Sequence, residues 1–480
     1  MVKESFCPLI EEIDTLLSPI AAFELLFEGK PFSFFLDSGM DPDRLGRYSF
    51  IGSSPFLVLS SRGSEIAITR GTEQSSMVGN PFDVVNNLME TYHLDCSSAP
   101  VPFLGGVVGY FSYDLCHFIE RLPSTAVDDL QLPECCLGFY DLVVAFDNLE
   151  SKTYIVSNGF PELRERERVE KAHRRLDEVK DSLANVLSSG GEVPLMPVSS
   201  PTGPVTLKGG FTHQEYVNAV EKARQYIIAG DIFEVNLSQR FEADLPITPY
   251  ELYRRLRQIN PAPFASYLGF DKVAVVSASP ERFIRLRGDQ VETRPIKGTR
   301  PRGKTPEEDE ALASELVNSV KDRAENIMIV DLERNDLGRV CCFGTVKVTE
   351  LAILEVFPTV FHLTSTVEGR LREGKNGIDL LKATFPGGSI TGAPKVRSME
   401  IIDELEPTRR SVYTGNIGYL SFNGDLDLNI AIRTFIVKGS KAYFQAGGAV
   451  VYDSEPENEY EETLHKARAL IDTLNMVPTG

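Results

Sequence analysis

Lys297 is the side chain of this sequence with the clearest potential for chemistry. It lies in the run Arg294-Pro-Ile-Lys-Gly-Thr-Arg-Pro-Arg-Gly303, where prolines and glycines restrict the backbone and three arginines add positive charge. Nearby positive charge disfavours a further cation, so the arginines are expected to lower the pKa of Lys297 from about 10.4 towards that of a usable amine nucleophile. The alternative is a solvated turn lysine, because lysines are rarely buried.

A carboxylate, that of Glu281, is expected beside this lysine. Residues 282–287 and 291–294 read as two short strands, and Gly288-Asp289 between them is a hairpin signal. A two-residue loop would place Glu281 opposite Ile296 and next to Lys297. A three-residue loop would place Glu281 opposite Lys297 itself, because a one-residue change in register turns side chains to the other face. Either register brings the carboxylate and the amine to the open end of one hairpin.

Three further carboxylates could hold a metal ion. Glu325 lies on a helix expected over residues 321–333, and Glu459 and Glu462 share one face of a helix expected over residues 459–472 with Lys466. If the two helices meet, their oxygens would suit Mg²⁺, which prefers one or two carboxylates together with an anionic substrate. The alternative is an ordinary surface ion pair between Glu462 and Lys466.

Two glycine-rich segments offer backbone N–H groups to an anion: Phe385-Pro-Gly-Gly-Ser-Ile-Thr-Gly-Ala-Pro-Lys395 and Gln445-Ala-Gly-Gly-Ala449. Neither has the residue order of a P-loop or of a dinucleotide-binding fingerprint. Together with the cations Arg433 and Lys466 they favour a dianionic ligand. His362 stands in an alternating strand, where a single histidine is more often structural, and the sequence has no Ser/His/Asp or zinc pattern.

The elements that must position these residues are strands mixed with separate helices. Residues 1–160 form a β-rich lobe, residues 161–210 a charged helix followed by a Gly/Pro/Ser-rich linker over 188–204, and residues 211–480 a second part that begins at the capping box Thr212-His-Gln-Glu215. Strands are also expected at 140–146, 360–367, 415–422, 427–437 and 441–451. Because regular βαβ alternation is missing, we predict an α+β fold built on antiparallel sheets.

Composition narrows the possible partners. The formal net charge of −20 predicts a surface that repels nucleic acid and anionic membranes, although a cleft can still be locally basic. No run of 18 apolar residues and no signal peptide is recognised. The seven cysteines are odd in number and lack CxxC spacing, which favours reduced thiols in the cytoplasm.

Six motifs in order carry a family resemblance. They are Ser279-Pro-Glu-Arg282, Pro295-Ile-Lys-Gly-Thr-Arg-Pro-Arg302, Asp331-Leu-Glu-Arg-Asn-Asp-Leu-Gly338, Pro386-Gly-Gly-Ser-Ile-Thr-Gly-Ala-Pro-Lys395, Ile430-Ala-Ile-Arg-Thr434 and Gln445-Ala-Gly-Gly-Ala449. Together they resemble the chorismate-utilising enzymes, which include anthranilate, aminodeoxychorismate, isochorismate and salicylate synthases. The resemblance spans about residues 211–472. Leu36-Asp-Ser38 and Gly46-Arg-Tyr-Ser-Phe-Ile-Gly52 extend it to the first lobe, and it implies the antiparallel β-sandwich of anthranilate synthase component I with outer helices.

The resemblance implies a role for each site residue in a Mg²⁺-dependent reaction on chorismate. Glu281 would be the general acid that protonates the departing 4-hydroxyl, and His362 would lie beside the ring. The expected metal ligands are Glu325 and Glu462, supported by Glu459. The expected substrate-binding groups are Ser389, Tyr413, Arg433, Gly447, Gly448 and Lys466.

Lys297 distinguishes the members of the family. Its Pro-Ile-Lys-Gly-Thr setting resembles the aminodeoxychorismate synthases, whereas anthranilate synthases usually carry alanine there. The lysine would add at C2, and ammonia would then add at C4 to give 4-amino-4-deoxychorismate for para-aminobenzoate and folate synthesis. Anthranilate synthesis and a non-catalytic chorismate or tryptophan sensor are the alternatives. Glu234 stands where isochorismate synthases carry a water-activating lysine and aminating members usually carry glutamine, so water addition is not expected.

Two further expectations concern ammonia and tryptophan. Because no cysteine lies in a Gly-x-Cys-x-Gly motif, a separate glutamine amidotransferase subunit would supply ammonia. Ser38 and Tyr48 mark a possible tryptophan pocket in the first lobe.

Overall fold

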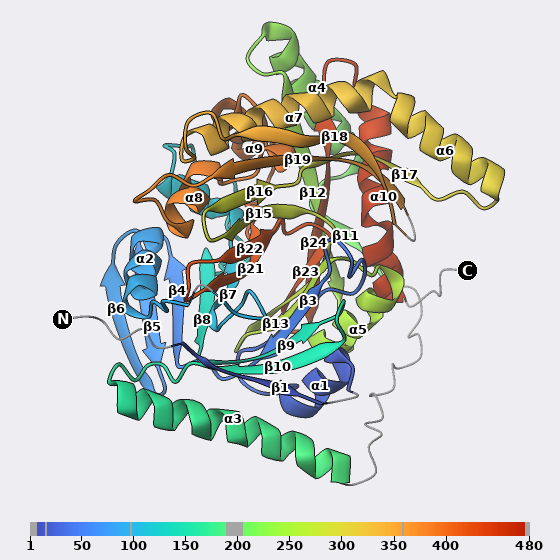
Figure 1. Ribbon diagram of the computed structural model, residues 1–480. Helices are drawn as coiled ribbons and strands as arrows, with labels where there is room; N and C mark the ends of the chain where they lie inside the picture. Colours follow the sequence, from blue (N-terminus) through green and yellow to red (C-terminus); the bar gives the residue numbers. More distant parts are fainter. Residues whose placement is uncertain (1–6, 15–16, 97, 189–204, 358–359, 476–480) are drawn as a thin grey trace.

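The computed structural model describes residues 7–14, 17–96, 98–188, 205–357 and 360–475. Most of the linker predicted over residues 188–204 lies outside the described residues. Within the described part, two 12-stranded sheets form, all ladders between their strands are antiparallel, and helices cover the outside (Figure 1). This architecture confirms the predicted α+β fold. In the same part of the chain, no helix has the length and apolar character needed to cross a membrane.

The first sheet contains strands from both ends of the chain. They are β1 (Leu9–Ile13), β2 (Ser33–Asp37), β3 (Tyr48–Gly52), β9 (Leu142–Asp147), β10 (Lys152–Ser157), β11 (Lys208–Gly209), β12 (Glu234–Asp244), β13 (Phe264–Gly269), β14 (Val273–Ser279), β20 (Gly392–Ala393), β23 (Thr434–Lys438) and β24 (Lys441–Val450). Their order is β1-β10-β9-β3-β2-β13-β14-β23-β24-β12-β11, and β20 pairs with β12. The sheet passes from the first lobe to the later strands where β2 pairs with β13.

The second sheet is shared in the same way. Its strands are β4 (Leu57–Arg62), β5 (Glu65–Arg70), β6 (Glu73–Val78), β7 (Gly106–Phe111), β8 (Cys135–Tyr140), β15 (Arg282–Arg287), β16 (Gln290–Thr293), β17 (Ile296–Pro301), β18 (Lys347–Val356), β19 (Val360–Arg370), β21 (Asn416–Ser421) and β22 (Leu426–Asn429). The order is β17-β19-β16-β15-β22-β21-β7-β8-β4-β5-β6, and β18 pairs with β19. The two parts of the chain therefore share both sheets.

Strand alternation divides the buried side chains of the first sheet between two cores. Phe34 and Val275 contribute to the large core with the second sheet, while their neighbours Phe35 and Val276 face a separate core with the helices. This is the period of two expected for a sheet covered on both faces.

The helices are α1 (Pro19–Leu26), α2 (Pro81–Thr91), α3 (Glu165–Ser188), α4 (His213–Ala229), α5 (Pro249–Ile259), α6 (Pro306–Asn318), α7 (Val320–Gly338), α8 (Gly377–Thr384), α9 (Lys395–Leu405) and α10 (Pro456–Asn475), with short 3₁₀ turns η1 (Tyr113–Phe118) and η2 (Gly388–Ile390). Helices α3, α5 and α10 pack on the first sheet, and α6 and α7 cover the β17–β19 end of the second (Figure 1). The predicted capping box is confirmed, because Thr212 and Glu215 cap α4 reciprocally, and α4 ends at left-handed Gly230.

Two predicted strands are each divided in the structure. The strand expected over 140–146 is the end of β8, a break at Asp141, and β9. The strand expected over 427–437 is β22 and β23, separated by residues 430–433, where the chain passes from the second sheet to the first. Arg433 has a left-handed φ of 51° in this crossing, which the alternating apolar pattern did not reveal.

A second crossing lies directly beside this one. The chain passes from β14 in the first sheet to β15 in the second through Pro280 and Glu281. The backbones of the two crossings are hydrogen-bonded, since Ile430 N donates to Glu281 O (3.0 Å) and Ala278 N to Arg433 O (3.1 Å). The carboxylate of Glu281 and the guanidinium of Arg433 therefore belong to two neighbouring crossings between the sheets.

Candidate active site

A cavity of about 760 Å³ lies at these crossings and collects most of the predicted site residues. Its lining includes Glu281, Lys297, Glu325, His362, Ser389, Tyr413, Arg433, Gly447, Glu462 and Lys466. They come from β17, α7, β19, η2, β24, α10, the crossing between β14 and β15, and the loops beside β21 and β23. Gly448 and Glu459 are not in the lining but lie together behind Glu462. A Cβ at Gly448 would stand 3.1 Å from Glu459 Oε2 and 3.3 Å from Glu462 Oε1.

Lys297 is buried and ion-paired. Its side chain is only 7% exposed, and Nζ lies 2.6 Å from Oε1 of Glu234, which is fully buried at the start of β12. Burial favours the neutral amine, but the negative charges of Glu234, Glu325 and Glu281 outweigh it and raise the pKa of Lys297. The predicted lowering of this pKa is therefore wrong, and so is the alternative of a solvated turn lysine.

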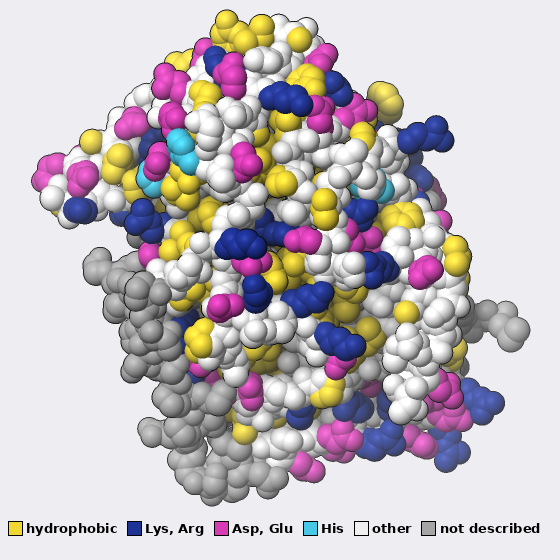
Figure 2. Space-filling view, turned by 180° about the vertical axis from the view of Figure 1, so that it is seen from behind, with side chains coloured by type: hydrophobic (Ala, Val, Ile, Leu, Met, Phe, Trp, Pro, Cys, Tyr) yellow, Lys and Arg dark blue, Asp and Glu magenta, His cyan; other side chains and the backbone are white. Residues whose placement is uncertain are grey.

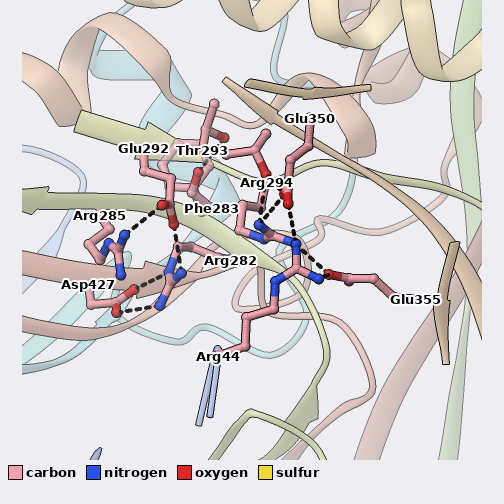
Figure 3. A network of polar contacts seen from close by, with 11 residues as sticks. Arg44, Arg282, Phe283, Arg285, Glu292, Thr293, Arg294, Glu350, Glu355 and Asp427 are labelled. Carbon is pink, nitrogen blue, oxygen red and sulfur yellow. Dashed lines mark hydrogen bonds and ion pairs between the residues drawn. The ribbon is translucent and has the colours of Figure 1, made fainter. Parts of the chain in front are cut away.

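Each of the three neighbouring arginines is paired with carboxylates of its own, and none is among the charges that act most strongly on Lys297. Arg294 lies between Glu355 (2.5 Å) and Glu350 (2.9 Å), and Arg44 approaches the same pair (Figure 3). Arg300 contacts Glu315 (2.8 Å) and Asp322 (3.1 Å), and Arg302 contacts Asp309 (2.6 Å).

Glu281 is placed to hold a proton at the cavity. The hairpin has the two-residue loop that the sequence allowed, with Arg287 paired to Gln290, whereas β17 pairs with β19 and not with β15. Oε1 of Glu281 accepts hydrogen bonds from Ser389 Oγ (2.7 Å) and from the amide of Ile296 (3.3 Å). Burial outweighs these contacts and raises the pKa of Glu281 to about 7, so the carboxyl can donate a proton near neutral pH.

Two cations, Arg433 and Lys466, supply positive charge to the cavity. The guanidinium of Arg433 has no hydrogen bond or ion pair with the described residues, and burial lowers its pKa. Lys466 donates to Gly447 O (3.0 Å) and pairs with Glu462 (2.7 Å). Positive charge is thus available to an anion although the chain is acidic overall, and on one face Lys and Arg side chains gather across the middle (Figure 2).

Two of the predicted metal ligands, Glu325 on α7 and Glu462 on α10, line the same cavity. Glu325 Oε1 and Glu459 Oε2 are buried without a hydrogen-bond partner in the described part of the chain. Burial raises the pKa of Glu325 to about 7 and also raises that of Glu459, whereas Lys466 lowers the pKa of Glu462. The described residues hold no group of three or more His, Cys, Asp or Glu side chains spaced for a metal ion. The oxygens Glu325 Oε1 and Glu459 Oε2 have no hydrogen bond with the described residues, and Glu325 Oε1 has a long ion pair with Lys321 (3.9 Å). Such oxygens fit a cation that uses few carboxylates and completes its shell with water and substrate.

His362 faces the cavity as a neutral imidazole. Its Nδ1 lies 2.9 Å from Thr299 Oγ1, and burial together with the charge of Arg433 lowers its pKa to about 3. It can make polar or ring contacts with a ligand, but at neutral pH it carries no charge.

Ser38 and Tyr48 line a separate cavity of about 270 Å³, to which later residues such as Arg287 also contribute. Ser38 Oγ donates to Tyr48 O (2.6 Å), and the Tyr48 ring is flanked by the guanidinium groups of Arg47 and Arg287. Tryptophan binding here stays a prediction.

The contact between Glu234 and Lys297 was not predicted. In the sequence, Glu234 differs from the residue expected at its place in the family, but no local pattern links it to Lys297. The two residues lie 63 positions apart, on strands of different sheets.

Comparisons with known proteins show the family of this chain. The family model of the chorismate binding enzymes matches residues 58–472. Anthranilate synthase component 1 of Acetivibrio thermocellus is 41% identical over 466 residues, covering 95% of this chain and 92% of its own. Aminodeoxychorismate synthase component 1 of Bacillus subtilis (strain 168) is 39% identical over 456 residues, covering 95% and 94%.

A solved structure supports the same assignment. The crystal structure of anthranilate synthase component I from Streptococcus pneumoniae TIGR4 superposes with a TM-score of 0.77 at 33% identity, covering 95% of this chain and 97% of that one. The chain belongs to the chorismate binding enzyme family.

Proposed function

We propose that this chorismate-utilising enzyme aminates chorismate at C4 with ammonia to give 4-amino-4-deoxychorismate. The observation that carries the proposal is the placement of Lys297 and Glu281 in one cavity. An amine that reaches C2 while an acid protonates the 4-hydroxyl would direct the incoming ammonia to C4.

The other residues of the cavity would hold the substrate. Arg433, which has no partner among the described residues, and Lys466 would bind the carboxylates of chorismate, with Ser389, Tyr413 and the amides at Gly447 and Gly448 in support. The oxygens of Glu325, Glu459 and Glu462 would hold Mg²⁺, which would neutralise a substrate carboxylate. A separate glutamine amidotransferase subunit would supply the ammonia.

Anthranilate synthesis is the second candidate. It is favoured by the sequence identity, because relatives at 41% identity carry the name anthranilate synthase component 1. The buried lysine disfavours it, since amination at C2 does not require a nucleophile that occupies C2 first.

The test is the product formed from chorismate, Mg²⁺ and an ammonium salt, identified by liquid chromatography and mass spectrometry. We expect 4-amino-4-deoxychorismate without released pyruvate. Anthranilate with stoichiometric pyruvate would refute the proposal in favour of the second candidate. Chorismate binding without turnover would favour a sensor. Glu281→Gln is the matched control, because it keeps the shape of the side chain and removes the acid.

A further inference from the structure

The ion pair between Lys297 and Glu234 poses a chemical problem for the proposed function. An amine attacks carbon only when it is neutral, yet in this cavity the side chain is held as an ammonium ion. The carboxylates of Glu281 and Glu325, together with Glu462, act on it electrostatically in addition to Glu234. The cations Lys321 and Lys466 are farther along the same cavity and belong to α7 and α10. The proton on Lys297 must therefore be removed within the site.

Glu234 is the carboxylate in contact with that proton. Oε1 lies 2.6 Å from Lys297 Nζ, and no other hydrogen bond or ion pair joins the lysine to the described residues. The second oxygen, Oε2, is buried without a hydrogen-bond partner in this part of the chain. The strand holds the residue firmly, because Glu234 pairs with Ala393 and its carbonyl oxygen accepts a hydrogen bond from Ser398 Oγ (2.9 Å).

We propose that Glu234 is the base that takes the proton from Lys297 before the amine attacks C2 and the acid that returns it when ammonia expels the amine. The inference rests on the proposed function. In the first step the lone pair of Nζ forms the bond to C2, both ring double bonds shift by one position, and the C4–O bond breaks. Glu281 gives its proton to the departing hydroxyl, which leaves as water.

The second step restores both carboxyl groups. Ammonia forms the bond to C4, both ring double bonds shift back, and the C2–N bond breaks with its electron pair on Nζ. Glu234 returns the proton to Nζ, and Glu281 takes a proton from the new ammonium group at C4. Chorismate and ammonia thus become 4-amino-4-deoxychorismate and water with no other reactant.

Glu234→Gln tests the assignment, because glutamine keeps the shape and cannot accept the proton. Losing a general base lowers kcat by about 100-fold or more at neutral pH. The neutral fraction of Lys297 would then depend on the solution, so the ratio of wild-type to Glu234→Gln kcat should shrink by about tenfold for each pH unit between pH 6 and 8. Glu234→Asp keeps a carboxylate and should retain the pH profile of the wild type at a lower rate.

Asp336→Asn is the matched control. Asp336 is a buried carboxylate paired with Lys395 outside the cavity. We expect the ratio of wild-type to Asp336→Asn kcat to be the same at each pH. Circular dichroism and thermal melting check that each variant folds. If Glu234→Gln does not fold, the comparison is made with Glu234→Asp.

The outcomes separate this inference from the proposed function. A wild-type product of 4-amino-4-deoxychorismate combined with a pH-independent ratio for Glu234→Gln would overturn the role of Glu234 alone. Anthranilate from the wild type would overturn both.

Discussion

The hydroxyl of Ser389 should set the pH at which this enzyme loses activity. Glu281 must be protonated to act as an acid, and its pKa is raised to about 7 by burial against the opposing hydrogen bond from Ser389. About nine tenths of the enzyme molecules would have a protonated Glu281 at pH 6, and about one tenth at pH 8. The alkaline limb of kcat is therefore expected near pH 7.

Ser389→Ala removes a donor that stabilises the carboxylate, so the acid should hold its proton to higher pH. A hydrogen bond to a charged group contributes about 1.5–3 kcal/mol, and one pKa unit corresponds to about 1.4 kcal/mol. The limb should then move upward by about one to two pH units. The assay is kcat against pH at saturating chorismate, with the concentration of free ammonia held constant.

The control for this experiment is Ser398→Ala, which removes a buried hydroxyl that donates to the backbone of Glu234 and does not touch Glu281. We expect the alkaline limb of the kcat profile of Ser398→Ala to stay near that of the wild type. A limb that stays in place or moves to lower pH in Ser389→Ala would show that this hydrogen bond does not control the acid.

Four further outcomes are expected. Lys297→Ala should abolish the covalent adduct with chorismate in intact-protein mass spectrometry and shift the product towards anthranilate, and an unchanged product and rate would make Lys297 a bystander. A chelator should abolish turnover, and added Mg²⁺ should restore it and raise the melting temperature; full activity in the chelator would exclude the metal. Burial raises the pKa of Glu333 to about 8, above about 4.3 in the unfolded chain. Between those two pH values the folded protein binds a proton that the unfolded chain has lost, so the wild type loses stability as pH rises. The melting temperature of Glu333→Gln relative to wild type should therefore be higher at pH 8 than at pH 5. An equal difference at the two pH values would contradict this. Cys7 and Cys96 have sulfur atoms 3.2 Å apart, so oxidised glutathione should join them in a disulfide seen by non-reducing peptide mapping, and recovery of only free or glutathione-capped thiols would contradict it.

Local signals in the sequence predicted local structure well. Gly288-Asp289 allowed a two-residue hairpin, and the pairing of Arg287 with Gln290 has that loop. Thr212 and Glu215 predicted the start of α4 because a capping box uses only residues of one turn. In each case the interaction that decides the structure lies within a few residues.

The charge state of Lys297 could not be predicted in this way. The arginines near it in sequence are paired with carboxylates as distant as Glu355, while the residue that contacts it, Glu234, is 63 positions away. Net electrostatic effects depend on all charges within a few ångströms. Only the tertiary structure shows which charges those are.

The break at Arg433 was missed for a related reason. Residues 427–437 have the apolar alternation of one long strand, and the point where a strand changes sheets leaves no compositional mark there. The left-handed backbone at Arg433 is imposed by the surrounding sheets.

The two neighbouring crossings also limit how the length of this chain can vary in related sequences. Arg282 pairs with Asn429 in the second sheet and Ser277 with Thr434 in the first, so four residues separate the two fixed ladders on each segment, 278–281 on one and 430–433 on the other. An insertion of one residue in either crossing would shift one ladder against the other and turn Glu281 or Arg433 away from the cavity. Surface loops can absorb such insertions. Natural variation in length should therefore accumulate in those loops and avoid residues 280–281 and 430–433.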